Sequence, residues 1–108
     1  MIAATPTPPY YVVLFTSIRT PEDHGYAAAA QRMLELAREQ PGFLGVESAR
    51  SDGLGITLSY WASEEAILAW RNHAEHVVVR EKGRAIWYAA CTTRVAKVER
   101  AYGFERSA

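Results

Sequence analysis

Apolar residues along this chain recur at every second position in some stretches and at every third or fourth position in others. Residues 10–18 are aromatic and β-branched, with apolar side chains at both odd and even positions, which predicts a strand buried on both faces. A second strand is predicted over 43–50 and a third over 56–61, and residues 51–53 (Ser-Asp-Gly) supply a hairpin turn between them. A fourth aromatic and β-branched strand is predicted over 86–98.

The first helix is predicted to begin at Thr20. This threonine is a good N-cap residue, Pro21 suits the first helical position, and Asp23 places a carboxylate three residues after the cap. The apolar residues that follow have the spacing of one packed helix face, and they are Tyr26, Ala29, Ala30, Met33, Leu34 and Ala37. Pro41 and Gly42 end this helix.

A second helix is predicted after Ser63, an N-cap residue followed by two glutamates whose charges suit the positive end of the helix dipole. Its apolar stripe would continue to about Arg84, through Ile67, Trp70, Ala74, Val77 and Val78. However, Asn72 is followed three residues later by Glu75, which is itself a cap signature. We therefore predict a break near Asn72 that gives two helices.

The predicted order is strand, helix, two strands in a hairpin, helix and strand, which is the βαββαβ order of a ferredoxin-like α+β fold. In this fold the helices cover one face of a four-stranded antiparallel sheet. Because residues 10–18 are apolar on both faces, the second face would expose a large apolar patch to water. We expect a second copy of the chain to cover it, as a homodimer through the sheet faces.

Composition narrows the classes of function. With 108 residues the chain is expected to form a single domain, with a flexible N-terminal arm over 1–9 and a C-terminal tail over 101–108. Lys and Arg together number 12, as do Asp and Glu, so no basic field favours nucleic acid or a membrane surface as a partner. The single cysteine, Cys91, fits a reducing compartment. The N-terminus lacks the pattern of a signal peptide, and we expect a cytoplasmic protein.

The chain resembles the antibiotic biosynthesis monooxygenase domain of the dimeric α+β barrel superfamily. The resemblance covers nearly the whole chain, and its marks are QPGFLG at 40–45, YWASEEA at 60–66 and AEH at 74–76. It implies a homodimer whose two sheets pack face to face, with a cavity for a small aromatic or apolar molecule between the sheet and helices of each subunit. Known members include monooxygenases that oxidise aromatic polyketides without metal or flavin, and others that degrade haem. Fold alone does not choose between them.

The haem branch can be compared with this sequence. Its pattern is an Asn in the first strand, a Trp in the second helix and an axial His about ten residues after that Trp. Trp70 matches the tryptophan, but residues 10–18 contain no Asn, and Arg80 stands at the position of the histidine. The sequence therefore favours the branch that needs no cofactor over haem degradation.

Six aromatic or imidazole side chains and one arginine are candidates for chemistry. His76 is favoured as a base for a phenolic proton because its unperturbed pKa lies near neutrality, Arg80 would stabilise the resulting oxyanion, and Trp70 would pack against the substrate ring. Further candidates for substrate contact are His73, Tyr60, Trp87 and Tyr88. His73 and His76 have a spacing that suits a metal, but no further ligand set completes such a site, so we expect no metal and no cofactor.

Each candidate also has a purely structural explanation. His76 suits the start of a helix, Trp70 suits a helix core, and Arg80 with Arg84 suits a solvated charged face. The leading hypothesis is a cofactor-independent monooxygenase that acts on a small aromatic molecule. The alternatives are a non-catalytic ligand-binding or stress-related protein and, less favoured, a haem-degrading monooxygenase.

Overall fold

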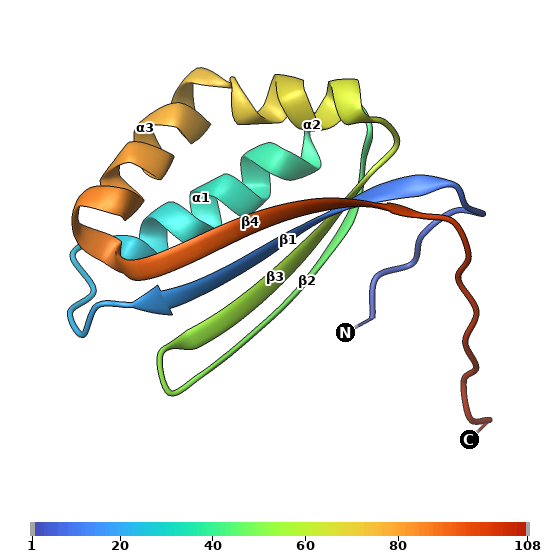
Figure 1. Cartoon of the computed structure of the whole chain (residues 1–108), viewed down its shortest axis with the longest axis horizontal. Coiled ribbons are helices and arrows are strands. Elements are labelled where there is room, and N and C mark those ends of the chain that lie inside the picture. The colour runs from blue at the N-terminus through green and yellow to red at the C-terminus, as the bar shows by residue number, and fades with distance from the viewer. Residues whose placement is uncertain (1, 108) are drawn as a thin grey trace.

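The structure, a computed structural model, describes residues 2–107 apart from the side chain of Ala74. Four strands form one antiparallel sheet in the order β2-β3-β1-β4. The strands are β1 (Tyr10–Arg19), β2 (Phe43–Ser51), β3 (Leu54–Trp61) and β4 (Tyr88–Val98). The helices are α1 (Tyr26–Arg38), α2 (Glu64–Arg71), α3 (Ala74–Lys82) and a π-helical turn, η1 (Gly83–Trp87), and they lie on one side of the sheet (Figure 1). The predicted ferredoxin-like α+β fold is confirmed.

The cross-strand register divides the sheet into a helix-facing side and an open side. Trp61 of β3 pairs with Tyr11 of β1, and its ring stacks on Trp70 of α2, so this row faces the helices. Side chains alternate along a strand, so the odd-numbered residues of β1 share that side and the even-numbered residues lie on the open side. The open side carries apolar side chains that are exposed by 48% at Ile18, 48% at Leu54 and 44% at Ile56. Of these three only Ile18 belongs to β1, whose other residues are buried or half-buried, so the predicted burial of β1 on both faces fails only near its C-terminal end.

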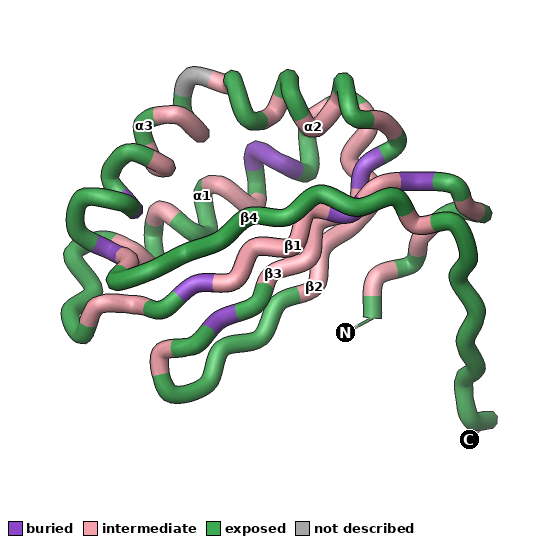
Figure 2. The backbone as a smooth tube through the Cα atoms, in the orientation of Figure 1, coloured by how far each residue is buried: buried purple, intermediate pink, exposed green. Residues whose placement is uncertain are grey.

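Part of the open side is covered by the N-terminal arm. The backbone N–H of Ala3 donates to a carboxylate oxygen of Glu47 at 2.8 Å, and the hydroxyls of Thr5 and Tyr10 lie 2.8 Å apart. Tyr10 and Val12 are accordingly buried. The edge strand β4, in contrast, is exposed over residues 89–97 on both of its faces (Figure 2). The helix layer thus leaves β4 accessible to solvent.

The β2–β3 hairpin and the end of α1 agree with the sequence. Asp52 and Gly53 have φ angles of 51° and 84°, the left-handed pair that a two-residue hairpin turn requires. Gly42, with φ of 85°, lies between α1 and β2 as predicted. None of the helices in residues 2–107 is long and apolar enough to cross a membrane.

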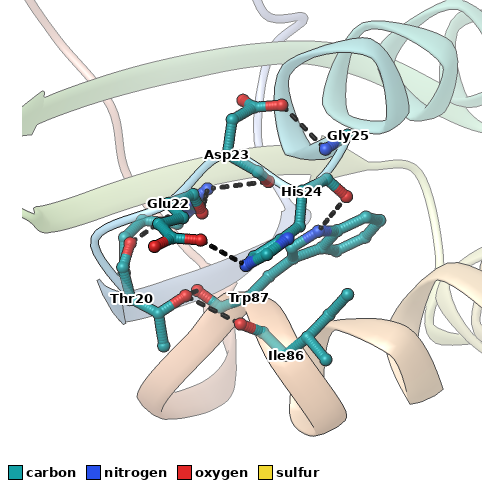
Figure 3. Close-up of polar contacts among 8 residues, drawn as sticks. Thr20, Glu22, Asp23, His24, Gly25, Ile86 and Trp87 are labelled. Atoms are coloured by element: carbon teal, nitrogen blue, oxygen red, sulfur yellow. Dashed lines mark hydrogen bonds and ion pairs between the residues drawn. The ribbon is translucent and has the colours of Figure 1, made fainter.

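The predicted start of the first helix is wrong. Helix α1 begins at Tyr26, and residues 20–25 form a loop. In this loop the hydroxyl of Thr20 donates to the backbone carbonyl of Ile86 at 2.7 Å (Figure 3). The side chain of Asp23 accepts from the backbone N–H groups of Gly25 at 2.8 Å and Ala27 at 3.1 Å, and so has the capping role predicted for Thr20. Thr20 has the chemistry of a cap, but a long-range partner takes its hydroxyl.

The predicted start of the fourth strand is also too early. Residues 83–87 form the π-helical turn η1 that continues α3, and β4 begins at Tyr88. The carbonyl of Trp87 accepts the backbone N–H of Thr20 at 2.9 Å, and strand pairing starts one residue later, between Arg19 and Tyr88. The indole N–H of Trp87 donates to the carbonyl of His24 at 3.0 Å (Figure 3). These contacts with the β1–α1 loop hold residues 86 and 87 in helical form despite their β propensity.

Candidate functional site

The predicted break in the second helical stretch is confirmed, with its caps distributed differently. Helix α2 starts at the predicted N-cap Ser63, whose hydroxyl accepts the backbone N–H of Ala66 at 3.1 Å. Asn72 is the C-cap of α2, and His73 is the N-cap of α3, where its Nδ1 accepts the N–H of Glu75 at 3.2 Å. His73 therefore has a structural role at the junction.

Aromatic rings connect the sheet to this junction. Phe43 of β2 meets Trp61 edge to face with ring centroids 5.4 Å apart, and Trp61 stacks on Trp70 at 6.2 Å. Trp70 in turn lies parallel to the imidazole of His76, with centroids 4.4 Å apart and planes inclined by 12°. Trp61 is fully buried and anchors the series in the core, while Trp70 and His76 are half-buried. Trp70 thus connects the core to His76.

A hydrogen bond sets the tautomer of His76. Its Nδ1 lies 2.9 Å from the backbone carbonyl oxygen of Trp70. Because a carbonyl only accepts, Nδ1 carries the proton, and Nε2 is the unprotonated nitrogen of the neutral ring. Burial lowers the pKa of His76 below its usual value, against the effect of this hydrogen bond, and the nearby positive charge of Arg80 lowers the pKa further. His76 is therefore neutral at neutral pH, with Nε2 able to accept a proton.

Arg80 also folds back onto α2. One turn after His76, its Nη1 donates to the carbonyl oxygen of Arg71 at 2.9 Å. Side chains from α3 thus cap the carbonyls of Trp70 and Arg71 at the end of α2, and the Trp70 carbonyl also accepts the N–H of His73 at 3.1 Å. The structure thus brings together Trp70, His73, His76 and Arg80, and we call these four residues the junction cluster.

Tyr60 lies on the open side of the sheet, away from the junction cluster. Its hydroxyl donates to a carboxylate oxygen of Glu47 at 2.7 Å, and its ring meets Tyr10 edge to face. Burial and the bond to Glu47 raise the pKa of Tyr60 to about 12, and this bond lowers the pKa of Glu47. Tyr60 is therefore engaged in a different contact and is not gathered with Trp70.

Trp87 and Tyr88 lie at the other end of the helix-facing side. Both rings meet the ring of Tyr26 edge to face, at 5.8 and 5.7 Å between centroids, and Tyr88 also meets Phe15 at 5.4 Å. The guanidinium carbon of Arg19 lies 3.8 Å from the centroid of the Tyr26 ring. Trp87 is buried and Tyr88 half-buried.

Sequence reasoning missed this second group of polar residues. Ser17 and Arg50 lie in predicted strands and Arg19 just after one, and none of the three is a predicted site residue, yet all three face the helices around Tyr26. The alternation of side chains along the strand could have revealed Arg50. Arg50, Val46 and Ser48 all have even numbers, so their side chains lie on the same side of β2. Among residues 2–107 no three His, Cys, Asp or Glu side chains gather as a metal site would require.

Comparisons with known proteins give the family. The model of the antibiotic biosynthesis monooxygenase family matches residues 9–82. The uncharacterized protein YqjZ of Bacillus subtilis (strain 168) is 52% identical over 107 residues, which cover 98% of this chain and 94% of that protein.

Two solved structures show the same fold at low sequence identity. SnoaB, a cofactor-independent oxygenase from Streptomyces nogalater, is 12% identical, with a TM-score of 0.70 over 92% of this chain and 100% of that one. Rv0793 from Mycobacterium tuberculosis is 16% identical, with a TM-score of 0.71 over 91% of this chain and 99% of that one. With the match of the family model to most of the chain, the conclusion is that this protein belongs to the antibiotic biosynthesis monooxygenase family.

Proposed function

We propose that the protein is a cofactor-independent monooxygenase that oxidises a small, electron-rich aromatic molecule at the junction cluster. The observation that carries this proposal is the neutral His76, held by the carbonyl of Trp70 with its Nε2 unprotonated and its ring stacked on an indole. A general base needs this protonation state before it meets a phenolic proton.

The residues of the junction cluster have separate roles. Nε2 of His76 accepts the proton of a phenol or of its tautomeric ring carbon, and the resulting anion is the electron-rich species that dioxygen attacks. Arg80 supplies positive charge near the developing oxyanion. Trp70 provides the aromatic surface against which the substrate ring packs. His73 holds the start of α3 and so positions His76 three residues later.

The chemistry balances with dioxygen as the only co-reactant. For an anthrone-type substrate the ring CH₂ and O₂ give C=O and H₂O, so one oxygen atom enters the product and the other leaves as water. The four electrons that reduce dioxygen come from the substrate carbon. His76 carries the proton during this conversion and returns to its neutral form.

In this proposal the protein is a cytoplasmic homodimer. Support for the dimer comes from the open side of the sheet, where Ile18, Leu54 and Ile56 expose about half of their surface. A second copy that packs against this side would bury them and leave the helix-facing side of each subunit available to substrate. The free Cys91 favours a reducing compartment.

Oxygen uptake by the metal-free protein with a panel of phenols and anthrones tests the proposal. Uptake that requires both protein and substrate, and that a chelator does not change, supports it. Uptake equal to that of the protein-free buffer with every substrate contradicts it and favours the non-catalytic ligand-binding alternative. The burial of Trp61 and Trp87 as core residues supports that alternative. A Soret shift on haem titration would favour the haem-degrading alternative.

A further inference from the structure

A cluster of five side chains lies on the helix-facing side of the sheet, at the end away from Trp61. Each of its side chains carries at least one hydrogen-bond donor. The five residues are Ser17, Arg19, Tyr26, Arg50 and Tyr88. We call it the arginine cluster. Along β1, Ser17 lies six residues beyond Tyr11, the partner of Trp61, which is about 20 Å of strand. The arginine cluster is therefore separate from the junction cluster.

A glycine gives Arg50 its position. Arg50, Gly55, Ser17 and Cys91 pair in one row across the four strands. The guanidinium of Arg50 lies directly over Gly55, where a Cβ atom would collide with it. Because Gly55 has no side chain, Arg50 reaches across β3 and its Nη2 donates to Ser17 Oγ on β1 at 2.8 Å. Arg50 is exposed and Ser17 is only 2% exposed, so a charged group lies at the surface over a buried hydroxyl.

The positive charge in this cluster is not balanced by an acid. The guanidinium carbons of Arg19 and Arg50 lie 3.8 and 5.8 Å from the centroid of the Tyr26 ring. Within residues 2–107 neither has a carboxylate oxygen within 4.0 Å. Arg19 donates to loop carbonyls, whereas Arg50 donates to the carbonyl of Gly53 at 2.6 Å and otherwise to hydroxyl groups. Two adjacent guanidinium groups without an acid attract an anion.

The cluster also has more donors than acceptors. Ser17 Oγ already accepts from Arg50, and Tyr26 Oη accepts from Arg50 at 3.4 Å, so their O–H groups are left to donate. The ring of Tyr88 meets that of Tyr26 edge to face, with centroids 5.7 Å apart, so the phenol of Tyr88 belongs to the same cluster. The hydroxyl of Tyr26 and the exposed N–H groups of Arg50 are therefore donors available to an anionic acceptor.

We propose that the arginine cluster binds a carboxylate group, with Arg50, held in place by Ser17, as the main contact and Tyr26 and Tyr88 as hydroxyl donors. A carboxylate has two acceptor oxygens that match the fork of a guanidinium, and it supplies the missing negative charge. The site is independent of the oxygenation proposed at the junction cluster, since it shares no residue with it.

Acetate and benzoate are the probes, and benzamide is the neutral counterpart of benzoate. Each is titrated into the full-length protein at neutral pH and constant ionic strength, while proton–nitrogen correlation spectra record the backbone amide of Ser17 and the Arg50 Nε–H signal. Both carboxylates are expected to shift these signals saturably, and benzamide is not. Tighter binding of benzoate than of acetate would show that the surrounding rings also contact the ligand.

Two variants test the site by different routes. Arg50→Gln removes the charge and is expected to weaken carboxylate binding by roughly tenfold or more. Gly55→Ala keeps every donor but displaces the guanidinium, and an equal loss is expected. Arg38→Gln, a change at an exposed arginine in the last turn of α1, is the matched control and should bind as the parent does. The spectra show directly whether each variant is folded.

Four results would overturn the proposal, three of them with the named probes and variant. These three are the absence of saturable shifts with both carboxylates, equal binding of benzamide and benzoate, and unchanged binding in folded Arg50→Gln. Binding of inorganic phosphate in place of either carboxylate would also reject it. Because no oxygenase activity is measured, an inactive protein leaves this test unaffected.

Discussion

The imidazole of His76 lies parallel to the indole of Trp70, although the two residues belong to different helices. On one continuous helix, residues six apart point in directions that differ by roughly 120° and cannot stack. The turn at Asn72 and His73 re-aims α3, so that the ring of His76 meets Trp70 and its Nδ1 meets the Trp70 carbonyl. The helix break is therefore the structural cause of the junction cluster.

If His76 is the general base, replacing it should slow the reaction far more than it weakens substrate binding. His76→Gln is expected to lower kcat by roughly 10²–10⁴-fold, the usual contribution of a general base. Steady-state oxygen uptake with the best substrate of the panel measures this. His24→Asn is the matched control, because His24 is an exposed loop residue whose positive φ asparagine tolerates. Equal activity of His76→Gln and the parent would reject the role of His76.

His76 should also make folding stability depend on pH. Burial lowers its folded-state pKa below the value of 6.5 for a free histidine, so the unfolded chain binds the proton more readily. Its contribution is complete above about pH 6.5 and is lost as the pH falls through the folded-state pKa. Urea denaturation of parent and His76→Gln from acid to neutral pH tests this. The difference between the two proteins should change with pH in that window, and a constant difference would contradict the prediction.

The fold was predictable from this sequence because strand and helix periods differ and each element is bounded by strong turn residues. Asp52 and Gly53 mark the hairpin, and the cap signature at Asn72 marks the break between α2 and α3. Thr20 and Ile86 show where local rules fail. Thr20 has the local pattern of a helix start and Ile86 that of a strand. The hydrogen bond between them, across 66 positions of sequence, determines the structure of both segments.

The candidate site was predictable only in part. Trp70, His76 and Arg80 come together because they lie close in sequence around one break. Tyr60 neighbours Trp61 in sequence, yet alternation along β3 sends the two rings to opposite sides of the sheet. The arginine cluster depends on Gly55 lying opposite Arg50, a cross-strand relationship that requires the register of the sheet.

The hydrogen bond from Thr20 to Ile86 should stabilise the β1–α1 loop and η1 together. Thr20→Val keeps the shape of the side chain but removes the donor to a carbonyl 2.7 Å away. We expect it to lower the free energy of unfolding by about 1 kcal/mol, and Thr20→Ser to retain most of the stability. Chemical denaturation followed by far-UV circular dichroism measures both. A valine variant as stable as the serine variant would show that this bond contributes little.

Gly42 should tolerate a side chain less well than Gly53, although both have positive φ angles. At Gly53 a Cβ atom would meet nothing within 4 Å, so Gly53→Ala should cost only the backbone strain of roughly 1–2 kcal/mol. At Gly42 a Cβ atom would lie 2.6 Å from the Cβ of Ala66, so α2 would have to move away from the turn that precedes β2. Urea denaturation should therefore show a larger loss for Gly42→Ala, and equal losses would contradict this packing.

A single charged substitution on the open side of the sheet tests the proposed homodimer. Ile56 lies on the inner strand β3 and exposes 44% of its surface on that side, so Ile56→Lys would place a charge inside the interface. We expect the parent to be a dimer in light scattering at micromolar concentration and this variant to be a monomer that remains folded. Val78→Lys is the matched control, because Val78 is 65% exposed on α3, on the helical side of the sheet, and its variant should remain dimeric. A monomeric parent would reject the dimer, whereas a dimeric Ile56→Lys would show that the two copies associate through another surface.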